Sequence, residues 1–246
     1  MLAGDWVVAV ALIIEEGGLN DNALVKDIED GKRRIKDHFL PQALLSHCGV
    51  EQAFDYRYWR IMRIAVHPML QNRKIGQRLI QAIALNAQQS HIDMLGTSFG
   101  LTPSLFQFWS RENWCLARIG FTQDHSSGES SGLMLKAISK SSFEFVQLVK
   151  HRFYRSFSFL LAEQYKALPA MLVIDILQQN DSADLSTITD ADLQTVHKFS
   201  SGKSQFDQCA YSLHLWLLHF ISDFKGPLYE KALTVLIKRL LQKQSQ

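Results

Sequence analysis

A strand, a short turn and a helix follow one another between residues 59 and 85, and this unit limits the folds open to the chain. Trp59–Val66 is an apolar run typical of a buried strand, and His67-Pro68 closes it. The turn Gln71–Gly76 leads into a helix whose apolar residues form one broad stripe: Ile75, Leu79, Ile80, Ile83 and Leu85. The free backbone N–H groups at such a helix start bind phosphate without a charged side chain. The unit therefore predicts a phosphate-binding turn.

The first 138 residues have the pattern of a mixed α/β domain. Strands are predicted over residues 5–15, 57–66, 92–98, 115–122 and 132–138. Helices are predicted over residues 21–47, with breaks near Gly31 and Pro41, over 75–89 and over 103–113. The last helix has Thr102 as its N-cap and Pro103 at its first helical position.

Strand signals fade after residue 138, and the remainder is predicted to be a helical tail. Its helices are expected over Phe143–Tyr154, Phe157–Lys166, Met171–Gln178, Asp190–Phe199, Phe206–Phe224 and Leu228–Gln242. Asp190 is the expected N-cap of its helix, and Gly226-Pro227 is a predicted helix breaker. The predicted division is therefore 1–138 and 139–246.

Composition indicates a protein that buries a core, because 47% of its 246 residues are apolar and 20% are charged. Cys48, Cys115 and Cys209 are an odd number at wide spacing, which predicts reduced thiols and a cytoplasmic location. No apolar run reaches the ~20 residues of a membrane span, and no signal peptide is recognised.

The net charge of +2 conceals several basic clusters. They are Lys32-Arg33-Arg34-Lys36, Arg57/Arg60/Arg63, Arg73/Lys74/Arg78, Lys150/Arg152/Arg155 and Lys238-Arg239 with Lys243. Such clusters follow a nucleic-acid backbone in some proteins and are solvated helix faces in others. The sequence alone leaves both interpretations open.

The turn resembles the pyrophosphate-binding signature Q-x-x-G-x-G of the GNAT acetyltransferases, with Lys74 at the first glycine position. The surrounding residues resemble one branch of these enzymes, the bacterial tRNA(Met) cytidine acetyltransferases. This similarity is carried by Arg60–Pro68, Ser98–Pro103, Leu105–Arg111, Arg118-Ile119-Gly120 and Ser126-Ser127-Gly128, and upstream by Gly31–Arg34 and Leu40–Leu44. It implies an α/β GNAT acyl-CoA N-acyltransferase fold with a mixed central sheet, followed by a mostly helical tail domain.

The resemblance also implies a function. Such enzymes use acetyl-CoA to form N4-acetylcytidine at the wobble position of elongator tRNA(Met). The partner is then tRNA, gripped in part by the tail 139–246, with no membrane and no DNA expected. Family members use ATP or GTP in a helicase-like module upstream, and no Walker A motif occurs in this chain. The chain is therefore expected to be the C-terminal portion of such an enzyme, poorly active or inactive alone.

The resemblance assigns the coenzyme-binding residues. The backbone of Ile64, Ala65 and Val66 is expected to pair with the pantetheine arm and the acetyl carbonyl. The expected pyrophosphate cradle is formed by Gln71, Asn72, Arg73, Lys74, Ile75, Gly76 and Gln77. Arg111 matches a family arginine that assists coenzyme binding. Ser104 stands where the family usually has Glu, which puts that carboxylate's role in doubt.

His67 is the candidate proton acceptor, because it directly follows the predicted coenzyme strand and its ordinary pKa of ~6.5 suits acid–base work. Its other interpretation is a strand-end residue that caps the turn. His125 is a weaker candidate, and no metal site is expected, since His214 and His219 are off the i,i+4 spacing of a metal pair. Two other functions stay open: a GNAT enzyme acting on a protein or small-molecule amine, and a non-catalytic RNA-binding remnant.

Overall fold

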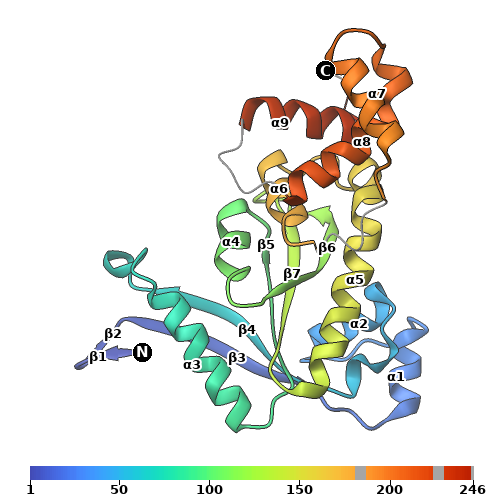
Figure 1. The fold of residues 1–246 in the computed structure, drawn as a ribbon. Coiled ribbons are helices and arrows are strands. Elements are labelled where there is room, and N and C mark those ends of the chain that lie inside the picture. Colours follow the sequence, from blue (N-terminus) through green and yellow to red (C-terminus); the bar gives the residue numbers. More distant parts are fainter. Residues whose placement is uncertain (181–186, 224–229, 245–246) are drawn as a thin grey trace. The chain divides into compact units, whose positions relative to one another are not determined.

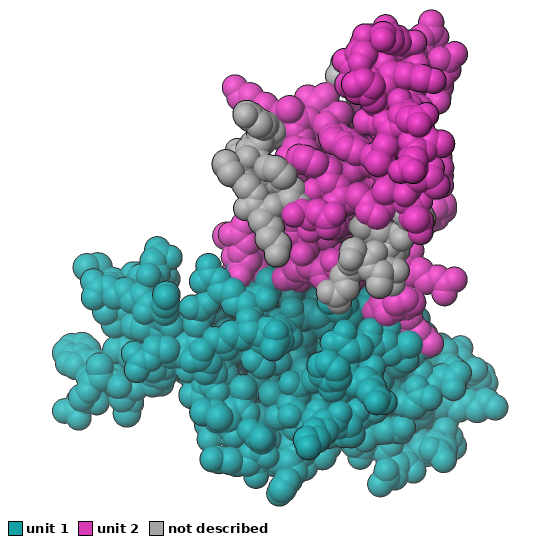
Figure 2. Space-filling view, in the orientation of Figure 1, with its two compact units in different colours: residues 1–101, 108–150 teal, residues 102–107, 151–246 magenta. Residues whose placement is uncertain are grey.

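The computed structural model describes residues 1–180, 187–223 and 230–244. The chain forms two compact units: residues 1–101 with 108–150, and residues 102–107 with 151–246 (Figure 2). This division lies within the helix α5 (Lys140–Glu163). The division into a domain of residues 1–138 and a tail of residues 139–246 remains a prediction from the sequence. The two units are described separately below.

The first unit is built on one mixed five-stranded sheet (Figure 1). Its strands, in spatial order, are β3 (Ala9–Gly17), β4 (Arg57–Val66), β5 (Met94–Gly100), β7 (Ser130–Ala137) and β6 (Cys115–Gln123). The β4–β5 pair is parallel and the others are antiparallel. Two short strands, β1 (Leu2–Ala3) and β2 (Trp6–Val7), form a separate ribbon. The predicted mixed sheet and its strand order along the chain are confirmed.

Strand β4 is irregular in two ways. First, Leu12 of β3 pairs with Arg63 whereas Ile13 pairs with Ile61, so Met62 is an extra residue, a β-bulge. Second, β4 and β5 pair only from Tyr58–Met94 to Ile61–Thr97. The last residues of both strands therefore separate, and the side chains of β4 change faces at the bulge.

The helices of this unit cover both faces of the sheet (Figure 1). On one face lie α1 (Asn22–Glu29) and α2 (Phe39–Cys48), and the Leu40 side chain of α2 sits directly over Gly96 of β5. On the other face lies α3 (Ile75–Gln89), whose Gly76 contacts Val66 of β4. Strand pairing places Arg60 on the Gly96 face and Val66 on the opposite one. Helices α2 and α3 are thus on opposite faces.

A buried ion pair fixes the start of α2. The Glu16 carboxylate is fully buried on β3 and binds Arg60 of β4 through Arg60 Nε. Its other oxygen accepts the Leu40 N–H at 2.7 Å, and the N-cap residue His38 makes no side-chain cap. Because the first N–H groups of a helix lack intrahelical partners, Glu16 serves as the cap from a distance. The pair therefore connects β3, β4 and α2.

The structure confirms the predicted break near Gly31 and changes three other predicted helix boundaries. Gly31, with φ +72°, separates α1 from α2, whereas Pro41 lies in the first turn of α2, where proline is tolerated. Helix α4 (Pro103–Trp109) is capped by Thr102 as predicted but ends before residue 113, because Glu112 and Asn113 have positive φ. The predicted helices Phe143–Tyr154 and Phe157–Lys166 form one helix, α5.

The second unit is helical, with no strand in the part of it that the structure describes. Its own helices are α6 (Ala170–Leu177), α7 (Asp190–Ser200), α8 (Phe206–Asp223) and α9 (Glu230–Leu236), followed by a π-helical turn at Ile237–Leu241. The N-cap of α7 is Thr189, not Asp190, because Thr189 and Asp192 form a capping box. The predicted breaker Gly226-Pro227 lies outside the described residues. No described helix is long and apolar enough to cross a membrane.

We expect Gly96→Ala to destabilise the first unit by about 1–3 kcal/mol, the cost of overpacking a filled core. A methyl group at Gly96 would collide with the Leu40 side chain and lie 3.3 Å from Leu135 Cδ2. Urea unfolding of the full chain measures the loss.

Leu40→Ala alone should cost about 2–5 kcal/mol by leaving a cavity. The double variant should lose less stability than the two single losses together, because the new methyl group then occupies that cavity. If the stability losses of the two single variants simply add in the double variant, the Leu40 side chain is not the reason why residue 96 must be glycine.

Candidate active site

The predicted phosphate turn is built as a helix start with three unused backbone donors. The first hydrogen bond of α3 runs from Arg78 N–H to Lys74 O at 3.0 Å. The N–H groups of Ile75, Gly76 and Gln77 precede this bond and have no intrahelical acceptor. They lie at the positive end of the helix dipole, so the turn suits an anion.

The backbone conformation of Lys74 explains why the signature usually has glycine at this position. Lys74 is the N-cap of α3 and has φ +61° and ψ +11°, a left-handed conformation that costs an L-residue roughly 1–2 kcal/mol. Asn72 in the same turn has φ +60°. The turn keeps its shape although a lysine replaces the glycine of the Q-x-x-G-x-G signature.

Gly76 is small for a different reason. A methyl group there would lie 3.1 Å from the ring of Phe108 and 3.6 Å from Val66 Cγ2. The absent side chain therefore lets the start of α3 approach the end of β4 closely. This approach brings the turn and the strand to one place.

The end of β4 has an open edge next to that turn. Ile64, Ala65 and Val66 lie beyond the last β4–β5 pair, so they face no strand on the β5 side. Gln71 of the turn donates its side-chain amide to Val66 O at 3.3 Å. The structure thus brings together the strand and turn that the sequence assigned to one coenzyme site, while the role of each residue stays a prediction.

His67 caps the short 3₁₀ turn Pro68–Leu70. Its Nδ1 accepts the Met69 N–H at 3.3 Å. In neutral histidine the nitrogen that accepts carries the lone pair and the other carries the proton. The basic nitrogen of His67 is therefore engaged within the chain, which favours the capping interpretation over proton transfer.

In the described residues Arg111 has no hydrogen bond or ion pair with the turn, and Ser104 lies in the other unit. Arg111 is exposed and follows α4, next to Glu112, which contacts Gln81 of α3. Ser104 is exposed in the first turn of α4, 3.3 Å from the Thr102 hydroxyl, and belongs to the second unit. Both assignments remain predictions from the resemblance.

Glu129 is a candidate proton acceptor that the sequence did not reveal. It is half-buried after the loop Ser126-Ser127-Gly128, and its carboxylate lies where a side chain on Gly100 would stand. Gly100 is the last residue of β5, and both residues line a cavity of about 670 Å³ together with His125. Only strand pairing between β5 and β7 brings residues 100 and 129 together, so no local signal marks Glu129.

The thiols of the chain are not joined by a disulfide in the structure, as the sequence predicts. Cys48 is half-buried and its Sγ donates to Ala117 O at 3.7 Å, whereas Cys115 and Cys209 are buried. Burial raises the pKa of Cys115 to about 12, so this thiol is not a nucleophile. No group of three or more His, Cys, Asp or Glu able to hold a metal ion occurs in the described part of the chain.

Comparison with known proteins identifies this architecture. Residues 82–139 match the family model GNAT acetyltransferase 2. The tRNA(Met) cytidine acetyltransferase of Nitrosococcus halophilus (strain Nc4) is 31% identical over 241 residues, which cover 97% of this chain and 32% of that relative. That of Haemophilus influenzae (strain ATCC 51907 / DSM 11121 / KW20 / Rd) is 40% identical over 143 residues, 58% of this chain and 21% of that relative.

A polyamine N-acetyltransferase of Drosophila melanogaster, known from a solved structure, aligns with a TM-score of 0.40 and 14% identity, covering 55% of this chain and 72% of its own. The chain spans about a third of the length of its relative from Nitrosococcus halophilus. The expected mixed α/β fold is present, and it is followed in the sequence by a helical region. The chain contains a GNAT acetyltransferase domain of the GNAT fold and is homologous over most of its length to the tRNA(Met) cytidine acetyltransferases.

Proposed function

We propose that this chain is the acetyl-transferring part of an RNA cytidine acetyltransferase. It would use acetyl-CoA to form N4-acetylcytidine at the wobble position of elongator tRNA(Met), within a longer ATP-dependent enzyme. The observation that carries the proposal is the 31% identity across 97% of the chain. The open end of β4 beside the start of α3 supports it. The grip of residues 139–246 on tRNA and the cytoplasmic location are part of the same proposal.

The residues at the turn fit an acyl-CoA. Three free N–H groups of α3 suit a pyrophosphate, and Lys74 adds a cation beside them. The unpaired edge of β4 continues from that point. It suits the pantetheine arm of the coenzyme, whose amide groups can form hydrogen bonds with the strand backbone. When bound, the coenzyme supplies an acetyl group activated as a thioester.

The chain's own groups then hold the amine and take its proton. A cytosine amine is neutral, so it needs no base before attack, and a proton leaves only as the new bond forms. Glu129 is the carboxylate best placed to accept it, because it lies at the end of β5, where β4 and β5 separate. His67 instead holds the turn after β4 in shape.

An acetylation assay on the full chain tests the function. Radiolabelled acetyl-CoA is supplied with tRNA(Met) transcript, spermidine or a lysine peptide, in the presence and absence of ATP and an upstream module from a relative. Transfer to cytidine of the tRNA is expected. Transfer to spermidine or peptide alone would identify an amine acetyltransferase, and failure to bind acetyl-CoA in a calorimetric titration would identify a non-catalytic remnant.

We expect His67→Asn to retain turnover within about threefold, because asparagine can also accept the Met69 N–H. Glu129→Gln should lower turnover by roughly 10²-fold with coenzyme affinity nearly unchanged, since the amide cannot take a proton. Initial rates under saturating substrate and calorimetric affinities measure both effects.

His67→Ala is the matched comparison, because it removes both the cap and any base. If alanine and asparagine at position 67 lose turnover equally by ~10²-fold, His67 is the proton acceptor and the capping interpretation is wrong. A Glu129→Gln variant with normal turnover would remove Glu129 from the reaction.

Lys74→Gly should raise the free energy of unfolding by roughly 0.5–1 kcal/mol, because glycine adopts a positive φ without the lysine's strain. Urea unfolding measures the gain. Lys36→Gly is the control, since Lys36 is also exposed but has no positive φ, and it should give no gain. Equal effects at both positions would mean that Lys74 is not strained.

A further inference from the structure

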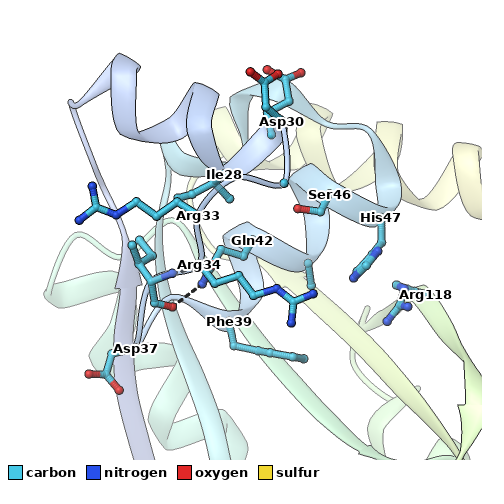
Figure 3. Close-up of a pocket in the computed structure, with 14 residues that line it drawn as sticks. Ile28, Asp30, Arg33, Arg34, Asp37, Phe39, Gln42, Ser46, His47 and Arg118 are labelled. Carbon is cyan, nitrogen blue, oxygen red and sulfur yellow. Dashed lines mark hydrogen bonds between the residues drawn. The ribbon is translucent and has the colours of Figure 1, made fainter.

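A second anion site is indicated on the face of the sheet that carries α2. A cavity of about 530 Å³ opens between the connection from α1 to α2, helix α2 itself and β6 (Figure 3). Its volume lies within the ~300–1,000 Å³ usual for small-ligand sites. Because α2 and α3 cover opposite faces, this cavity is separate from the phosphate turn of α3.

Two guanidinium groups and an imidazole converge in this cavity. Arg34, His47 and Arg118 point toward one another in Figure 3. None of them forms an ion pair with a carboxylate in the part of the chain that the structure describes, whereas Lys32, Arg57 and Arg60 do. Burial, then the charges of Arg118 and Arg34, lowers the pKa of His47, so the neutral imidazole is favoured beside the two guanidinium groups.

Glu29, Asp30 and Asp37 are the acidic side chains that line the cavity, and in the described residues none of them forms an ion pair with Arg34, His47 or Arg118. Asp30 forms an ion pair with Lys32 at 2.6 Å. Figure 3 shows Asp30 and Asp37 directed away from Arg34, His47 and Arg118. Guanidinium groups that approach each other without a carboxylate repel, so an anion between them is favourable.

An aromatic ring is held at the edge of the same cavity. Phe39 is 43% exposed, and the Arg60 guanidinium lies 5.2 Å from its ring centroid. Arg60 is in turn held by the buried Glu16. The ring is therefore a fixed apolar surface beside the cations, the combination with which proteins bind unpaired nucleotides.

We infer that this cavity binds one nucleotide of an unpaired RNA segment. Its phosphodiester lies between Arg34, His47 and Arg118, and its base stacks on the free face of Phe39. Arginine forks bind phosphate oxygens in pairs, and stacking on an aromatic ring tolerates any base. The inference rests on the proposed function, since it names where the RNA substrate is held relative to the acetyl site.

The test is fluorescence anisotropy of a labelled ten-nucleotide oligocytidine RNA with the full chain. The double variant Arg34→Ala/Arg118→Ala should weaken binding about tenfold or more and reduce the salt slope by about 0.7 per lost phosphate contact. The control Lys26→Ala/Lys36→Ala removes two positive charges from exposed sites outside the cavity and should retain affinity within about twofold. Arg34→Lys/Arg118→Lys should recover only part of the loss, because lysine keeps the charge without the fork.

Four outcomes would overturn the inference. Equal weakening by the control pair would mean that the RNA senses only net charge. Unchanged RNA binding by Arg34→Ala/Arg118→Ala would place the RNA elsewhere, and the proposed acetylation of RNA could still hold. Loss of CoA affinity in this variant, measured by calorimetry, would assign the cavity to the coenzyme. Absence of RNA binding by the unchanged chain would contradict both the inference and the proposed RNA substrate.

Discussion

The early end of the pairing between β4 and β5 is the constraint on which the rest of the first unit depends. Parallel pairing stops at Ile61 and Thr97, and the bulge at Met62 changes the faces of the residues that follow. The backbone N–H and C=O groups of a strand inside a sheet are normally paired with the neighbouring strand. An unpaired edge therefore suits a ligand that supplies the missing hydrogen-bond partners. The close contact of Gly76 then places the start of α3 at the same point.

The sheet separates two sites of positive potential. The free N–H groups of α3 lie on one face, and the cavity with Arg34 and Arg118 lies on the other. In the proposed function this arrangement keeps the coenzyme and RNA phosphates from competing, and the gap between β4 and β5 is the place where their reacting groups meet. The buried Glu16–Arg60 pair supports the second face, because it fixes both the start of α2 and Phe39.

Local signals predicted the central unit of the fold well. The observed β4 and α3 match the predicted ranges 57–66 and 75–89, because an apolar run closed by a proline and an amphipathic stripe are each contained in the segment itself. The predicted helix boundaries were wrong where packing against residues outside the segment determines the structure. Residues 155–156 were expected between two helices, but they continue α5, because Phe153 and Phe157 on either side of them are both buried.

The candidate site divides in the same way. The sequence by itself determined the phosphate turn, the strand before it and the candidate His67, since these residues are neighbours in the chain. Tertiary structure decided that Nδ1 of His67 accepts a backbone N–H and that Glu129 lies against Gly100. It also decided that Arg34 and Arg118 line one cavity, where neither forms an ion pair with a described carboxylate. A charge or hydrogen bond depends on distances in space, so only the folded sheet, which joins residues many positions apart, could fix which groups are paired and which remain available for a ligand.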